Sequence, residues 1–71
     1  MIKQYISIDI GGTMIKYGII DETGNILEAK EVQTEAFKGG DYIFNKVKNI
    51  CENYILERKI YGICISTAGM V

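Results

Sequence analysis

Hydrophobic and polar positions alternate along the first half of the chain. Residues 5–10 place three isoleucines on one face and polar side chains on the other, which predicts a strand. Two glycines and a threonine then supply a turn, and residues 14–21 predict a second strand, antiparallel to the first. Gly18 inside it indicates a bulge or a close backbone approach. A turn in which Gly24 adopts a positive φ leads to a third strand over about residues 26–33.

The second half of the chain changes to a helical period. Residues 34–40 predict a loop, and Asp41 is the expected N-cap of a helix from residue 42 to about 57. Its apolar positions follow helical spacing. They are Ile43, Val47, Ile50, Cys51, Tyr54 and Ile55. Residues 60–65 are almost wholly apolar, which is typical of a short strand covered on both faces. The third strand carries Glu28, Lys30 and Glu31, so we expect it at a sheet edge.

The element order β-β-β-α-β predicts an α/β fold with a mixed sheet. A right-handed crossover through the helix would place the last strand parallel to the first and beside it, giving the strand order 3-2-1-4. Residues 11–13 and 66–69 would then emerge side by side at the carboxyl ends of two parallel strands. Ligand crevices in such sheets open at these ends.

Composition and charge narrow the function classes. The chain has 71 residues, 48% of them hydrophobic and 24% charged, which allows one small globular domain. A net charge of −1 argues against binding to nucleic acid or to an anionic membrane. The chain has no histidine, and Cys51 and Cys64 lack the spacing of a zinc site, so both are expected to be buried core thiols. No signal peptide or spanning segment is visible, and a cytoplasmic location is expected.

The turn after the first strand carries the candidate chemistry. Asp9 ends the strand, Gly11, Gly12 and Thr13 form the turn, and Lys16 lies on the strand that leaves it. Backbone N–H groups of a glycine turn can surround phosphate oxygens, while a carboxylate can hold Mg²⁺ or its waters. On the glycines alone, a plain hairpin turn with a capping carboxylate is the favoured interpretation. The G-x-x-x-x-G-K and G-x-G-x-x-G motifs are absent.

The whole pattern resembles the ROK family. The residues that carry the resemblance are Asp9, Gly11, Gly12, Thr13, Lys16, Gly18 and Asp21, with a second landmark at residues 62–71, Gly-Ile-Cys-Ile-Ser-Thr-Ala-Gly-Met-Val. The family includes sugar kinases of the actin-like ATPase superfamily. The resemblance implies a truncated half-domain of the ribonuclease H-like fold, in which residues 1–71 are the N-terminal part of the first actin-like ATPase domain.

The resemblance also implies roles for particular residues. Asp9 would lie near Mg²⁺, through water, and near the phosphates of ATP. Gly11, Gly12 and Thr13 would form the phosphate cradle, with Lys16 as a further phosphate contact. Gly69 would lie against the sugar, with Thr67 as a second substrate contact, and Met70 leaves the identity of the sugar open.

The other functional motifs of the family have no counterpart in these 71 residues. The general base, the second phosphate motif and the adenosine-binding region are missing, as is the motif that holds structural Zn²⁺ in intact enzymes. No catalytic residue is therefore expected in these 71 residues, and the chain alone is expected to be inactive. The intact enzyme would transfer the γ-phosphoryl group of ATP to a hexose or N-acetylhexosamine hydroxyl and would form a homo-oligomer, most simply a dimer.

Three other interpretations are weighed. ROK transcriptional regulators carry a helix-turn-helix segment ahead of the phosphate loop, and the loop begins too close to Met1 to leave room for one. Other members of the superfamily, such as pantothenate, acetate or activator-type ATPases, share a D-x-G-x-T core, but the Ser-Thr-Ala-Gly landmark fits them less well. A non-catalytic relic that binds nucleotide is the third alternative.

Overall fold

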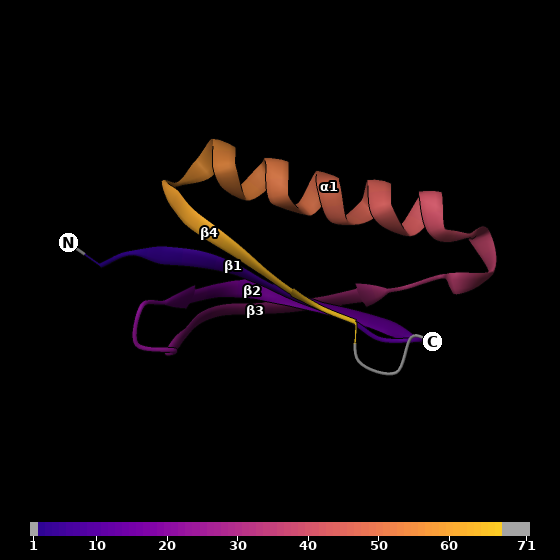
Figure 1. The fold of residues 1–71 in the computed structure, drawn as a ribbon, viewed down its shortest axis with the longest axis horizontal. Helices are drawn as coiled ribbons and strands as arrows, with labels where there is room; N and C mark the ends of the chain where they lie inside the picture. Colours follow the sequence, from indigo (N-terminus) through magenta and orange to yellow (C-terminus); the bar gives the residue numbers. More distant parts are fainter. Residues whose placement is uncertain (1, 68–71) are drawn as a thin grey trace.

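The computed structural model describes residues 2–67. The elements, in chain order, are β1 (Gln4–Ile10), β2 (Met14–Asp21), β3 (Ile26–Gln33), a 3₁₀ turn η1 (Ala36–Lys38), α1 (Gly40–Glu57) and β4 (Ile60–Ser66). The sheet order is β3-β2-β1-β4, with β4 parallel to β1 and the other pairs antiparallel. Figure 1 shows α1 lying along one face of this sheet. The predicted α/β fold and strand order are confirmed.

The core lies between α1 and one face of β1 and β2. The alternation predicted for β1 is confirmed, because Ile6 and Ile8 are almost fully buried. They pack with isoleucines of β2 and with one side of α1. The other core members are Ile10, Ile15, Ile19, Ile43, Val47, Cys51 and Tyr54. Burial also raises the pKa of the Cys51 thiol, as befits a core cysteine. Ile55 was expected in this face but is 53% exposed, because it lies one residue, about 100° of helix rotation, beyond Tyr54.

The start of α1 differs from the expectation. Gly39, with a φ of 93°, occupies the N-cap position, and no side chain caps the helix. Asp41 is therefore not the N-cap; it lies in the first turn, where its negative charge is favourable to the helix dipole. The preceding loop also contains η1, which the sequence pattern did not predict.

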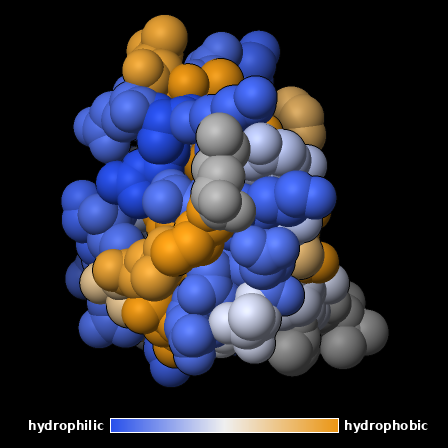
Figure 2. Space-filling view, turned by 90° about the vertical axis from the view of Figure 1, so that its left-hand side faces the viewer, coloured by the Kyte–Doolittle hydropathy of each residue, from blue (hydrophilic) through white to orange (hydrophobic). Residues whose placement is uncertain are grey.

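The last strand is less covered than its apolar sequence predicts. Tyr61, Ile63 and Ile65 are 41%, 45% and 53% exposed, and Cys64 is also exposed, so the expectation of a buried thiol at that position was wrong. The reason is that α1 packs over β1 and β2, while β4 forms an edge of the sheet. Figure 2 shows apolar surface between polar side chains on the end of the molecule where α1 finishes. At the opposite edge, the charged strand β3 is confirmed as the exposed border.

Two glycines take the roles that the sequence predicts. A Cβ atom at Gly18 would lie 1.9 Å from the backbone oxygen of Glu28, so only glycine allows β3 to approach here. The β2–β3 pairing also shifts register between Ile19 and Ile20, as at a bulge. Gly24 has a φ of 90° in the turn between these strands.

Candidate functional site

The site begins where β1 and β4 end. Their parallel pairing places Asp9 beside Ser66, and the Ser66 hydroxyl donates a hydrogen bond of 2.9 Å to Oδ1 of Asp9. The two segments that the sequence predicts to emerge together do so, up to the last described residue, Thr67. A carboxylate and a hydroxyl thus meet at the carboxyl ends of two parallel strands, which is where α/β sheets bind ligands.

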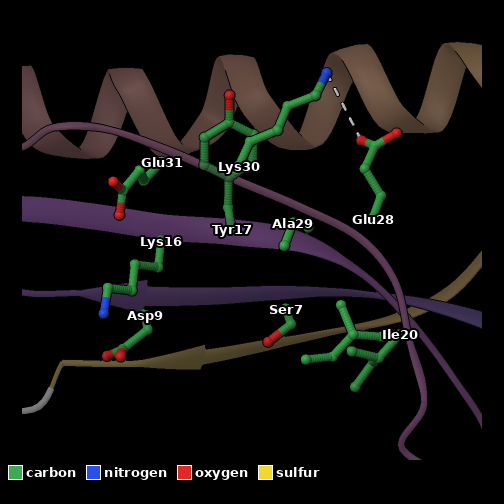
Figure 3. Close-up of a pocket in the computed structure, with 11 residues that line it drawn as sticks. Ser7, Asp9, Lys16, Tyr17, Ile20, Glu28, Ala29, Lys30 and Glu31 are labelled. Atoms are coloured by element: carbon green, nitrogen blue, oxygen red, sulfur yellow. Dashed lines mark ion pairs between the residues drawn. The ribbon is translucent and has the colours of Figure 1, made fainter.

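Lys16 lies next to Asp9 across the sheet. The two residues are register partners on β1 and β2, and Lys16 is in turn the partner of Glu31 on β3. Figure 3 shows the Lys16 and Asp9 head groups close together on the same side of the strands. Among residues 2–67, neither takes part in an ion pair. An ammonium and a carboxylate are therefore both available to a ligand at this end of the sheet.

The glycine turn connects these two side chains. The Gly11 N–H donates to the Met14 oxygen at 2.9 Å, and a Cβ atom at Gly11 would lie 3.0 Å from that same oxygen. In this structure the Gly11 N–H is thus used by the hairpin itself. Gly12 is different, because a Cβ atom there would have no neighbour within 4 Å.

Thr34, immediately after β3, makes two hydrogen bonds to the backbone of the glycine turn. Its hydroxyl donates to the Gly11 oxygen and its N–H to the Thr13 oxygen, both at 2.8 Å. Thr34 is fully buried. In a trans peptide the C=O and the following N–H point in opposite directions. Because the Gly11 C=O points at Thr34, the Gly12 N–H points away from the interior, and no acceptor for it exists among residues 2–67.

A groove extends from this end along the uncovered face of the sheet (Figure 3). Its volume is about 500 Å³. Small side chains at Ser7, Gly18 and Ala29 leave room for it, while Asp9, Lys16 and Glu31 line one end. The groove therefore has charged side chains at the end near the glycine turn and small side chains along the rest of its base.

A second polar cluster surrounds Glu35, next to Thr34. Its carboxylate accepts from Lys46 at 2.9 Å and from the Tyr42 hydroxyl at 2.7 Å, and it forms an ion pair of 3.1 Å with Lys38. These partners, Lys46 first, lower the pKa of Glu35 to about 2. The same contacts raise the pKa of Lys46 and of Lys38. The cluster ties the chain after β3 to α1.

A divalent cation fits this site only in a hydrated form. Among residues 2–67 there is no group of three His, Cys, Asp or Glu side chains that could hold a metal directly. Asp9 supplies one carboxylate, and its Oδ2 has no hydrogen-bond partner in the same stretch. Mg²⁺ typically keeps several waters and uses one or two carboxylates with substrate phosphates. One carboxylate therefore suits a hydrated Mg²⁺. Side chains of this stretch alone could not surround the ion.

Of the residues predicted to lie against the sugar, the structure describes only Thr67. Thr67 is exposed just beyond β4. Gly69 and Met70 lie outside the described residues. In residues 2–67 no helix is long and apolar enough to cross a membrane.

Sequence reasoning missed two residues that build the site. Thr34 carries no local signal, because a threonine at a strand end is common and its partners are more than 20 positions away. Glu35 was expected to be a solvated edge residue, yet its φ of 55° and its three partners set it apart. Ser66 was recognised only as part of a loop. The fold alone brings these residues to the turn.

A mixed sheet of order 3-2-1-4 with one helix, and a glycine turn at the end of its first strand, defines the class: an N-terminal half-domain of the actin-like ATPase type. The family model described as "ROK family" matches residues 5–71. The chain belongs to the ROK family.

Individual proteins are similar to the same stretch. An uncharacterized protein of Clostridium perfringens (strain 13 / Type A) is 56% identical over 64 residues, which cover 90% of this chain and 22% of that protein. A glucokinase of Streptomyces coelicolor is 35% identical over 66 residues, 93% of this chain and 20% of the relative. A glucokinase of Streptomyces lividans gives the same values. The chain spans about a fifth of the length of the curated relatives it matches.

Proposed function

We propose that these residues form the phosphate-binding part, and one wall of the acceptor site, of an ATP-dependent sugar kinase. In the whole protein the γ-phosphoryl group would pass to a hydroxyl of a hexose or N-acetylhexosamine. The observation that carries the proposal is the pairing of Asp9 with Lys16 at the carboxyl end of β1, next to a glycine turn in which the Gly12 N–H has no backbone acceptor among residues 2–67. Two relatives named glucokinase, which match this same stretch, support the choice of acceptor.

Each group has a distinct part in this proposal. The Gly12 N–H donates to a phosphate oxygen, and Thr13 adds a hydroxyl donor at the exposed turn. Lys16 neutralises phosphate charge. Asp9 holds a hydrated Mg²⁺ by one carboxylate oxygen, and the bound Mg²⁺ supplies charge neutralisation for the transferred phosphoryl group. Thr67 and Gly69 border the sugar.

These groups would position the phosphates of ATP and neutralise their charge. None of them would act as the general base that accepts the proton of the sugar hydroxyl. Phosphoryl transfer needs the donor and the acceptor to be held together. We therefore expect residues 1–71, taken alone, to lack kinase activity, and we expect this stretch to be the first part of the first domain of an actin-like kinase working in the cytoplasm. Structural Zn²⁺, where bound, would belong to other parts of the protein.

The test is ADP release by the longest naturally encoded chain that contains this sequence, across a panel of hexoses and N-acetylhexosamines. Asp9→Asn removes the charge and keeps the shape, and we expect turnover to fall at least about 100-fold. Asp41→Asn, in the exposed first turn of α1, is the matched control and should stay near the wild-type rate. Sugar-independent ADP release, or no turnover with any sugar by a folded protein, would contradict the proposal and favour a regulator or a non-catalytic nucleotide-binding protein.

A further inference from the structure

Thr34 holds both ends of the glycine turn from inside the protein. Its side chain is fully buried and donates to the Gly11 oxygen, while its own N–H donates to the Thr13 oxygen. The two acceptors lie on either side of Gly12. The backbone on both sides of Gly12 is therefore fixed by one residue that is distant in sequence.

This arrangement decides where the Gly12 N–H points. The Gly11 C=O is turned inward by the Thr34 hydroxyl, so the peptide plane turns the Gly12 N–H outward. Without the hydroxyl, the Gly11 oxygen would be left next to a buried side chain with no donor, and the peptide would tend to rotate toward water. Rotation would turn the Gly12 N–H away from its outward direction.

The backbone next to Thr34 is strained. Glu35 has a φ of 55° and a ψ of 51°, and among residues 2–67 it is the only non-glycine residue with a positive φ. Such a conformation is unfavourable for a side chain with a Cβ atom and persists where surrounding contacts enforce it. Here Lys46, Tyr42 and Lys38 hold the Glu35 carboxylate. The strained residue fixes the direction in which the chain leaves Thr34.

We propose that Thr34 is a positioning residue for nucleotide phosphate: through the Gly11 and Thr13 oxygens it holds the turn so that the Gly12 N–H faces a phosphate oxygen. Thr34 does not itself touch the ligand, since it is buried beneath the turn. The inference rests on the proposed function only in taking the ligand to be a nucleotide; it does not depend on which sugar is phosphorylated.

Three variants of the longest naturally encoded chain test it. Thr34→Val keeps the shape and the N–H but removes the hydroxyl, and Thr34→Ser keeps the hydroxyl. Thr23→Val is the matched control, because the Thr23 hydroxyl also donates a short hydrogen bond, to Asp21 at the opposite end of the sheet, and accepts one from Asn25. Binding of a non-hydrolysable ATP analogue with Mg²⁺ is measured by calorimetry, and the KM values for ATP and for the sugar are measured separately.

We expect Thr34→Val to bind the analogue about tenfold more weakly and to raise the KM for ATP by a similar factor, with the KM for the sugar unchanged. Thr34→Ser should restore binding to within about twofold of the wild type. Unchanged binding by Thr34→Val would overturn the inference, as would equal losses in Thr34→Val and Thr23→Val. A folded Thr34→Ser as weak as Thr34→Val would also overturn it.

A measurement on the wild type covers the case in which Thr34→Val does not fold. The amide resonance of Gly12 should shift when the analogue is added, while that of Gly24, whose N–H is bonded to the Asp21 oxygen, should not. A Gly12 amide that does not respond would overturn the inference, and so would a wild-type protein that binds no nucleotide. Binding of the analogue without turnover of any sugar would overturn only the proposed function.

Discussion

Ser66 and Asp9 are joined by a hydrogen bond of 2.9 Å across the parallel pair β1 and β4. The Ser66 hydroxyl donates this bond to Oδ1 of the Asp9 carboxylate. Its other oxygen has no hydrogen-bond partner among residues 2–67 and is left for a ligand. The last residue of β4, the strand after the helix crossover, thus contacts the acidic residue next to the end of β1.

Removing the Ser66 hydroxyl should let the Asp9 side chain adopt more orientations while it keeps its negative charge. We expect Ser66→Ala to require about threefold more Mg²⁺ for half-maximal nucleotide binding, because an exposed hydrogen bond to a carboxylate contributes modestly. Titration of Mg²⁺ at fixed nucleotide measures this. Ser7→Ala, on the same face of β1, is the control. Identical Mg²⁺ curves for Ser66→Ala and the wild type would show that the bond does not orient Asp9 for the cation.

A methyl group at Gly12 should weaken nucleotide binding and leave the fold intact. The space that a Cβ atom would occupy at this position is open within the protein, so the methyl group meets no neighbour there. It would instead add bulk beside the Gly12 N–H, where the proposed function places a phosphate. We expect Gly12→Ala to keep its melting temperature within about 2 °C and to bind nucleotide about tenfold more weakly. Calorimetry with unchanged affinity would argue that phosphate does not approach this residue.

The opposite outcome is expected at Gly18. A Cβ atom there would lie 1.9 Å from the Glu28 oxygen, which is backbone and cannot turn aside. Gly18→Ala should therefore cost about 3 kcal/mol or more of folding free energy by forcing β2 and β3 apart. Denaturant unfolding measures the loss, and Gly12→Ala serves as the control. A loss below about 1 kcal/mol would mean that the strands separate easily at this position.

Stability should depend on pH through Glu35. Its pKa falls from an ordinary 4.5 to about 2 in the folded protein, so folding favours the ionised carboxylate. The stabilisation is complete above pH 4.5 and is lost as the pH falls from 4.5 toward 2. Glu35→Gln should be less stable than the wild type at pH 7, and the difference should shrink across that window. A difference that stays constant from about pH 7 to about pH 2.5 would contradict this assignment.

The apolar edge strand should make this 71-residue chain self-associate, most simply as a dimer. β4 contains no charged residue, whereas β3 carries three, and unpaired apolar edges readily pair with another strand. Light scattering should give a mass that rises with concentration. Ile65→Lys should reduce it, while Leu27→Lys on β3 should have little effect. A monomer at millimolar concentration would contradict the prediction.

The strands and the helix follow closely from local pattern. The three isoleucines of β1 fall on one face because the side-chain period of a strand is two, and Cys51 is buried because the period of α1 is about 3.6. The helix start was less predictable. A positive φ at Gly39 depends on how the loop reaches the sheet, and Asp41 looks the same in sequence whether it caps the helix or lies in its first turn.

The sequence by itself determined the element order, the strand pairing and the identity of the turn with Asp9, Gly12 and Lys16, because these depend on side-chain period and on nearby residues. Only the tertiary structure decided that the Gly11 N–H is used by the hairpin, that Ser66 donates to Asp9, and that Thr34 donates to the oxygens of Gly11 and Thr13. The contacts of Ser66 and Thr34 join residues far apart in the chain. Strand register and packing determine which residues meet in this way. The pattern of hydrophobic and polar residues in a short segment does not reveal them.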